Sequence, residues 1–92
     1  MKEDILKEAL FYVYILHSKP ADKIYIGYSV DPHRRLLSHN HPQNKGWTKR
    51  YQPWEIFYTE TFESKSLALK REKQLKTAQG RRFIHEKLLK HS

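Results

Sequence analysis

Residues 11–30, FYVYILHSKPADKIYIGYSV, contain two runs of β-branched and aromatic side chains. The first run covers residues 11–17 and the second covers residues 24–30, and both are typical of β-strands. Between them, Pro20 and Asp22 favour a turn. The stretch therefore predicts a β-hairpin, to which the rest of the fold is added.

The register of this hairpin determines which tyrosines lie together. We expect Leu16 to pair with Tyr25, and this pairing places Tyr14 and Tyr25 on one face of the sheet. Tyr14 then lies opposite Gly27, which leaves room above the sheet. Aromatic residues on a hairpin commonly belong to a core, which is the alternative to a chemical role. A tyrosine acts as a base only if its pKa falls from about 10, and a nearby arginine or bound cation favours that change.

After the hairpin, Asp31 and Pro32 supply an N-cap and a first-turn proline, which predict a helix to about Asn40. Residues 43–53 lack helical or strand periodicity and are predicted to form a loop. Residues 54–62 alternate with the two-residue period of a strand. The residues on one face of this strand are Trp54, Ile56, Tyr58 and Phe62.

Ser64 is expected to cap a helix that runs to about Ala78. Gly80 is expected to separate it from a last, basic helix over residues 81–90. The predicted order is strand, strand, helix, strand, helix, helix. This order favours an α+β fold, with a small three-stranded antiparallel sheet flanked by helices, over a doubly wound parallel sheet.

A chain of 92 residues fits one domain with a single small core, and we expect this domain to span residues 11–90. Residues 1–10 are expected to form an extension with a weak amphipathic helical pattern, able to dock on the core or on a second copy. They lack the apolar run of a signal peptide, and no stretch of the sequence is typical of a membrane span. A cytoplasmic location is therefore expected.

The charge of the chain favours a polyanionic partner. Lysine and arginine outnumber acidic residues by eight, and neutralising phosphates releases condensed counterions. Composition alone leaves open an anionic lipid surface or a merely soluble basic protein. The absence of cysteine excludes disulfides, thiolate nucleophiles and cysteine-based zinc sites, and the scattered histidines do not predict a zinc site.

Glu72 is an acid on an otherwise apolar helical stripe, four residues after Ala68 and three before Leu75. As an oxygen ligand it suits Mg²⁺ or Mn²⁺, which take only one or two carboxylates and complete their coordination with water and phosphate oxygens. The alternative is an ordinary surface ion pair with Lys76.

Arg35 and His39 lie four residues apart on the predicted helix after Pro32, so they could converge on one phosphate. Arg34 is a competitor that the spacing does not exclude. His39 could also simply complement the helix dipole at the C-terminal end.

Five short motifs follow one another along the chain: Tyr12-Val13-Tyr14 with Tyr25-Ile26-Gly27, Arg35 with His39, Thr48-Lys49, Pro53-Trp54, and Arg71-Glu72. Their order and spacing resemble the GIY-YIG nuclease family, and most closely its small stand-alone bacterial members. The likeness covers residues 11–84.

This resemblance implies a metal-dependent endonuclease that hydrolyses DNA phosphodiester bonds with one Mg²⁺ or Mn²⁺. In the implied catalytic set, Tyr14 and Tyr25 flank the phosphate, Arg35 stabilises it, His39 assists proton transfer and Glu72 holds the cation. Which tyrosine is the base stays open.

Two departures from the family pattern bear on activity. Tyr12 stands where the first motif has its glycine, and no asparagine follows Glu72, where many members have one. The second departure predicts weak or conditional cleavage. The alternative function is a nucleic-acid-binding module of the same fold with little or no cleavage.

The predicted loop over residues 43–53 mixes cations with aromatic side chains, which suits phosphate contacts and stacking on unpaired bases. No recognition helix is evident, so we expect structure-selective binding of branched or distorted DNA, with RNA as a further partner, by a monomer or weak homodimer. The expected DNA-binding residues are Lys45, Trp47, Lys49 and Arg50, with Tyr51 beside them.

Overall fold

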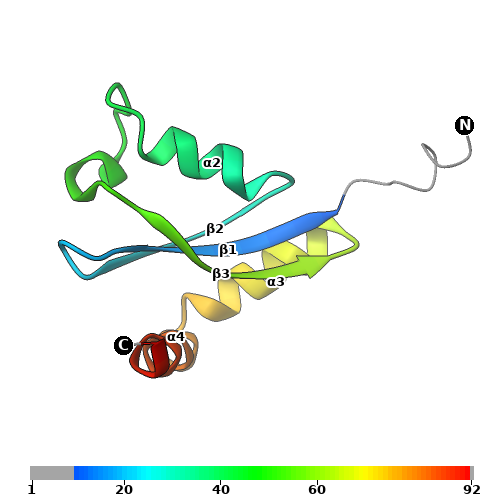
Figure 1. The fold of residues 1–92 in the computed structure, drawn as a ribbon. Coiled ribbons are helices and arrows are strands. Elements are labelled where there is room, and N and C mark those ends of the chain that lie inside the picture. The colour runs from blue at the N-terminus through cyan, green and yellow to red at the C-terminus, as the bar shows by residue number, and fades with distance from the viewer. Residues whose placement is uncertain (1–9, 92) are drawn as a thin grey trace, which may run out of the picture.

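The computed structural model describes residues 10–91, and its architecture confirms the predicted α+β class with one three-stranded antiparallel sheet (Figure 1). The strand order is β2-β1-β3, so β1 is central. The predicted N-terminal extension, apart from Leu10, lies outside the described residues. The elements are β1 (Phe11–Ser18), β2 (Lys23–Ser29), α2 (Pro32–His39), the 3-10 helix η1 (Trp47–Tyr51), β3 (Glu55–Phe62), α3 (Lys65–Leu75) and α4 (Ala78–His91).

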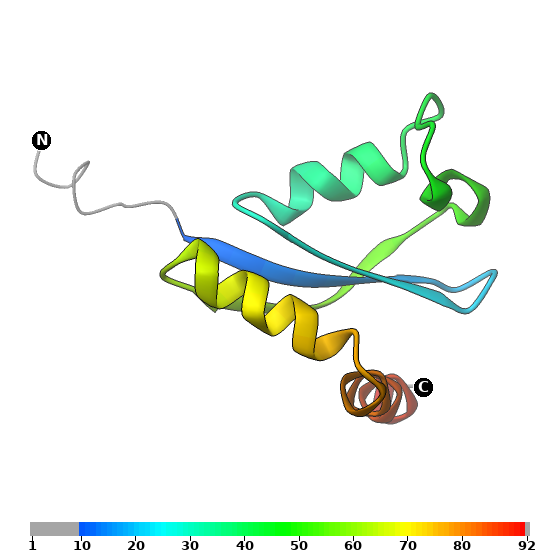
Figure 2. The same cartoon turned by 180° about the vertical axis from the view of Figure 1, so that it is seen from behind.

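The helices cover both faces of the sheet. Figures 1 and 2 show α2 on one face, hereafter the α2 face, and α3 and α4 on the other, hereafter the α3 face. In the described part of the chain, no helix has the length and apolar character needed to cross a bilayer.

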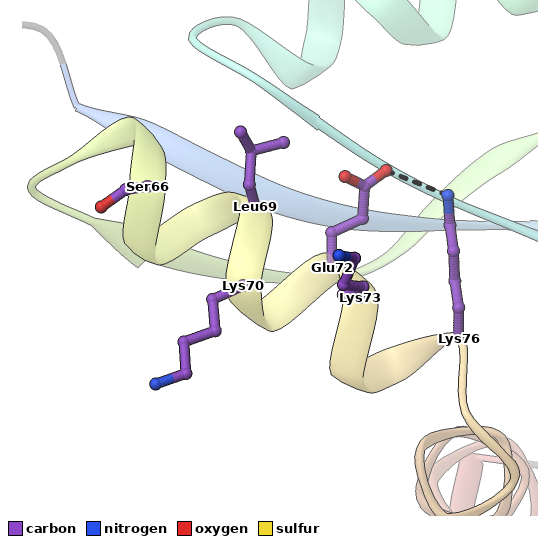
Figure 3. Close-up of a pocket in the computed structure, with 6 residues that line it drawn as sticks. All are labelled: Ser66, Leu69, Lys70, Glu72, Lys73 and Lys76. Carbon is purple, nitrogen blue, oxygen red and sulfur yellow. Dashed lines mark hydrogen bonds and ion pairs between the residues drawn. The ribbon is translucent and has the colours of Figure 1, made fainter.

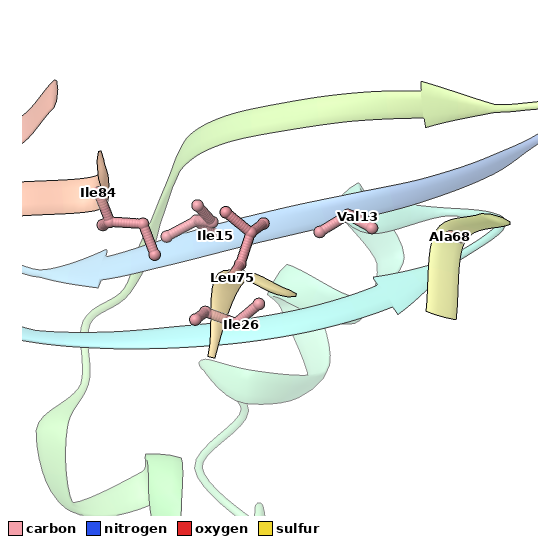
Figure 4. Close-up of a cluster of buried hydrophobic side chains, with 6 residues drawn as sticks. All are labelled: Val13, Ile15, Ile26, Ala68, Leu75 and Ile84. Atoms are coloured by element: carbon pink, nitrogen blue, oxygen red, sulfur yellow. The ribbon is translucent and has the colours of Figure 1, made fainter. Parts of the chain in front are cut away.

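Each face of the sheet has its own buried cluster. Tyr14, Leu16 and Trp54 are buried on the α2 face. The α3 face buries Val13, Ile15, Ile26, Ala68, Leu75 and Ile84 (Figure 4).

The predicted hairpin and its register are confirmed. β1 pairs antiparallel with β2, with Leu16 opposite Tyr25 and Tyr14 opposite Gly27. Asp22, in the turn, has a φ of 52°, a left-handed conformation that aspartate tolerates better than most residues. Side-chain alternation along both strands therefore brings Tyr14 and Tyr25 to the same face of the sheet.

The predicted single face of the third strand is wrong. Ile15 pairs with Tyr58, but the next residue, Leu16, pairs with Ile56, so β3 carries one extra residue, Phe57, at a bulge. A bulge reverses the alternation of side chains beyond it. Ile56 consequently packs on the α2 face, whereas Tyr58 packs on the α3 face.

The helix after the hairpin begins as predicted, because the Asp31 carboxylate accepts a hydrogen bond from the Arg34 backbone at 3.1 Å. The loop predicted over residues 43–53 is wrong in part, since it contains η1. A side-chain contact helps to hold this short helix: the indole of Trp54 donates to the Thr48 carbonyl at 2.8 Å. Such a contact leaves no periodic signal in the sequence.

The predicted break at Gly80 is also wrong. α3 ends at Leu75, three residues earlier than expected, and α4 already begins at Ala78, so Gly80 lies inside a helix. A Cβ atom at Gly80 would lie 2.4 Å from the carbonyl oxygen of Gln74 and from the Cα of Leu75. The glycine therefore allows α4 to approach the end of α3, instead of terminating a helix.

We expect Gly80→Ala to lower the free energy of unfolding by roughly 1–3 kcal/mol. In an unstrained helix the same change would stabilise the protein by about 0.5–1 kcal/mol, so the sign of the effect reports the close approach. Urea denaturation would measure it, with Gln79→Ala at the exposed neighbouring position as the control. An unchanged or increased stability of Gly80→Ala would contradict the tight packing of α4 on α3.

Candidate functional site on the α2 face

The two tyrosines of the hairpin lie next to each other. Tyr14 is buried, with 1% of its surface exposed, and Tyr25 is half-buried. Their ring centroids are 6.2 Å apart. A Cβ atom at Gly27 would lie 2.8 Å from the Tyr14 hydroxyl oxygen, so only glycine leaves space for this phenol across the strand pair. The room that the sequence predicted above Gly27 is thus occupied by the Tyr14 ring.

His39 is held between both tyrosines and the η1 segment. Its Nε2 atom lies 3.4 Å from the Tyr14 hydroxyl, and its Nδ1 atom lies 2.9 Å from Thr48 Oγ1. The centroids of the Tyr25 and His39 rings are 4.5 Å apart. Only 7% of the His39 surface is exposed. Contacts on both ring nitrogens fix the orientation of the imidazole. A favourable interaction with the helix dipole alone would not require this fixed orientation.

Two residues that support His39 were missed by the sequence reasoning as part of the site. Thr48 is buried, and its hydroxyl oxygen accepts a hydrogen bond from Asn44 Nδ2 at 2.8 Å. The same Asn44 amide donates to the His39 carbonyl at 3.0 Å. Polar residues in a segment without periodicity resemble solvent-facing loop residues, so the sequence carried only a weak signal, the Thr48-Lys49 motif.

A pocket of about 280 Å³ opens on this face. Tyr25, Arg35, His39 and Trp47 are among the residues that line it, and Arg34 is not. Although the spacing left both arginines as candidates, the structure directs Arg35 toward the pocket. Tyr14, in contrast, does not line the pocket; it is buried and contacts His39, which does.

Burial and the charge of Arg35 control the protonation of this cluster. Burial raises the pKa of Tyr14 above its usual value, and a hydrogen bond with Arg35 only partly opposes this. Burial, followed by the positive charge of Arg35, lowers the pKa of His39. At neutral pH, Tyr14 is therefore a protonated phenol and His39 is a neutral imidazole. The raised pKa of Tyr14 is opposite to what a phenolate base requires.

The lowered pKa of His39 predicts a pH-dependent stability. Between its lower folded value and the unfolded value of about 6.5, the unfolded chain binds more protons, so the free energy of unfolding falls as the pH falls. We expect His39→Gln to flatten this decline below about pH 6.5, as measured by urea denaturation at several pH values. His33→Gln, an exposed change on the same helix, is the control. Equal profiles for His39→Gln and the parent would contradict the burial of a neutral imidazole.

Glu72 lies apart from this pocket, on α3 and hence on the α3 face (Figures 1 and 3). Its side chain is 17% exposed, and its carboxylate accepts a hydrogen bond from Lys76 Nζ at 3.1 Å, so the ion pair considered from the sequence is present. In Figure 3 the carboxylate points from α3 toward β2, the strand that carries Tyr25. It lines a surface depression together with Lys70 and Lys73.

Among residues 10–91, no group of three or more histidine, aspartate or glutamate side chains could hold a metal ion. A cation at Glu72 would thus have at most two such side chains from these residues. Such a donor set fits Mg²⁺ or Mn²⁺, which keep water molecules and take substrate phosphate oxygens.

The expected DNA-binding residues differ in their exposure and in their contacts within the protein. Trp47 is 50% exposed, and its ring lies 5.3 Å from that of Tyr51 and 5.8 Å from that of the buried Trp54. Lys49 donates a hydrogen bond to the carbonyl of Pro42, so it also holds its own loop. Lys45, just before η1, and Arg50, within it, are exposed.

Comparison with known proteins places these residues in a wider context. Residues 10–85 match the family described as the GIY-YIG catalytic domain. A UPF0213 protein of Staphylococcus saprophyticus is 39% identical over 79 residues, which cover 86% of this chain and 89% of that protein. A UPF0213 protein of Staphylococcus epidermidis is 39% identical over 66 residues, which cover 72% and 79%. One of Staphylococcus haemolyticus is 38% identical over 69 residues, which cover 75% and 83%.

Proposed function

The chain belongs to the GIY-YIG catalytic-domain family, which is nuclease-type, and on this basis we propose that it is a metal-dependent endonuclease acting on DNA. The observation that carries the proposal is the pocket on the α2 face, where Arg35, Tyr25 and His39 meet. A guanidinium, a phenol and a neutral imidazole are the groups that bind a phosphate and move a proton beside it.

Each group in the pocket has a separate role in the proposed reaction. Arg35 binds the non-bridging oxygens of the phosphate and stabilises the charge that develops on them. Tyr25 is half-exposed in the pocket, so it orients the attacking water. His39, neutral at pH 7, accepts the proton of that water at Nε2, which requires the Tyr14 hydroxyl, 3.4 Å away, to turn from this nitrogen. The contact between Nδ1 and Thr48 keeps the imidazole in place.

Glu72 is the proposed ligand of the divalent cation. Bound there, the cation would neutralise phosphate oxygens. α3 contacts β2, an edge strand, and the Glu72 carboxylate points toward that strand. Glu72 therefore points toward the edge strand that carries Tyr25, although the two residues lie on different faces of the sheet. Lys76 must release the carboxylate before a cation binds.

The η1 end of the α2 face supports selectivity for DNA structure. Trp47 lines the pocket and leaves half of its surface exposed, which suits stacking on an unpaired base. Lys45 and Arg50, both exposed, would contact phosphates of the same strand. We therefore propose branched or distorted DNA as the substrate class, with unpaired bases next to the cleaved bond.

The test is nicking of supercoiled plasmid and of a labelled branched DNA, with Mg²⁺ or Mn²⁺ compared with a chelator. Metal-dependent cleavage, stronger on the branched DNA than on a matched linear duplex, would support the proposal. The Glu72–Lys76 ion pair favours a second candidate, a nucleic-acid-binding module without cleavage. Salt-dependent binding by folded protein, without nicking under any metal condition, would select that second candidate.

A further inference from the structure

The excess positive charge of the chain is concentrated away from the pocket. Residues 65–91 contain nine lysines and arginines against two glutamates, a net charge of +7, whereas the whole chain carries +8. These residues form α3 and α4, which lie on the α3 face in both views of the molecule (Figures 1 and 2). The pocket alone therefore does not account for the basic character of the protein.

Four of the nine cations have structural partners. Arg71 binds Glu60 at 2.8 Å, and Lys76 binds Glu72 at 3.1 Å. Lys87 lies 4.9 Å above the centre of the Tyr58 ring, and Lys65 lies 6.0 Å from that of Tyr28. The other five are exposed, and no hydrogen bond, ion pair or ring contact within residues 10–91 engages their side chains. They are Lys70, Lys73, Arg81, Arg82 and Lys90.

Lys70, Arg81 and Arg82 do not help the fold, whereas Lys73 lies in the last turn of α3, where a cation is favourable. Lys70 and Lys73 are three residues apart on α3 and line one depression, and Arg81 and Arg82 are adjacent in the first turns of α4. Like charges three residues apart on a helix repel each other, and cations near a helix N-terminus, such as Arg81 and Arg82, oppose its dipole. A surface made only for solubility would mix charges of both signs. A bound polyanion would remove the repulsion.

We propose that Lys70, Lys73, Arg81 and Arg82, the α3–α4 surface, form a second binding site for nucleic-acid phosphates. It holds the duplex that flanks the cleaved phosphate, so the bound nucleic acid contacts both faces of the sheet and passes the β2 edge. Nucleic acid is favoured over a lipid headgroup layer because the surface adjoins Glu72, whose carboxylate points toward the strand of Tyr25. The inference rests on the proposed function in one respect, namely that the phosphate next to this duplex is the one cleaved in the pocket.

The test compares two variants that each lose four positive charges. In one, Lys70, Lys73, Arg81 and Arg82 are replaced by glutamine. In the other, the same replacement is made at Lys19 in the turn between β1 and β2, at Lys23 at the start of β2, and at Lys45 and Arg50. Binding is measured in chelator, without cleavage, for a 20-base-pair DNA duplex, the equivalent RNA duplex and the tetranucleotide (dT)₄. Circular dichroism and thermal unfolding check that both variants are folded, and Arg81→Gln with Arg82→Gln serves as a milder pair.

The α3–α4 variant is expected to bind duplex roughly 10-fold or more weakly in low salt, with the salt slope reduced by up to about 4, while its affinity for (dT)₄ is retained. The comparison variant should lose affinity for (dT)₄ as well. The two duplexes reveal whether the flanking strand pair is DNA or RNA.

Three results would overturn the inference. Equal losses for duplex and (dT)₄ in the α3–α4 variant would mean that only overall charge matters. An unchanged affinity for duplex would remove the site. Loss of binding to phosphatidylserine vesicles with duplex affinity retained would assign the surface to lipid. Absence of nicking, with the expected binding pattern intact, would refute the proposed nuclease and leave this surface in place.

Discussion

Glu72→Gln is expected to lower the rate of metal-dependent DNA cleavage by about 10²- to 10³-fold, because the charged oxygen ligand is replaced by a weaker, neutral one. The substitution keeps the shape of the side chain and its place between the buried Ala68 and Leu75, so the fold should be retained. Affinity for DNA in chelator should be unchanged or slightly higher, because one negative charge is removed. Nicking rates and Mn²⁺ titration would together measure the effect.

Two companion variants make this experiment specific. Glu86→Gln removes an exposed carboxylate from α4 and should leave cleavage at the parent rate. Lys76→Gln removes the ammonium group that binds Glu72 at 3.1 Å, so it should increase Mn²⁺ affinity. If Glu72→Gln cleaved DNA at the parent rate, Glu72 would only be the surface ion pair with Lys76. The metal would then have to bind through other groups.

The elements that the sequence predicted correctly are those with local, periodic signals. The hairpin register follows from two runs with a period of two, and it brings Tyr14 and Tyr25 together without further information. The start of α2 follows from Asp31 and Pro32, which act within one helical turn. In both cases the residues that determine the structure are neighbours in the chain.

The features that were missed depend on contacts between different elements, which leave no periodic signal in the sequence. The bulge at Phe57 is set by pairing with β1, and the place of Gly80 is set by the end of α3. The support of His39 by Thr48 and Asn44 requires η1 to fold back on α2. Helical spacing placed Glu72 on a packed stripe, but it did not show which face of the sheet that helix would cover. Spacing alone therefore identified candidates, and the fold determined their surroundings.

The choice between Arg34 and Arg35 is the clearest case in which the fold decides, and it leads to the second large effect. Both arginines are exposed, but Arg35 lines the pocket and interacts with Tyr14, whereas Arg34 does not line the pocket. Arg35→Gln is expected to lower the cleavage rate by about 10²- to 10³-fold, because the cation that stabilises developing charge on the phosphate is lost. Arg34→Gln, which removes the same charge one residue away, should stay near the parent rate.

Arg35→Gln should also change the pH dependence of the remaining activity. The charge of Arg35 helps to lower the pKa of His39, so its removal should raise that pKa. If neutral His39 accepts the proton, activity is lost as the pH falls through this pKa, and the acid limb of the pH–rate profile should move to higher pH. Arg34→Gln should leave the limb where it is in the parent. Loss of activity in Arg34→Gln but not in Arg35→Gln would contradict the assignment of the phosphate to this pocket. Loss in Arg35→Gln with an unmoved acid limb would keep the phosphate role but remove His39 as the acceptor.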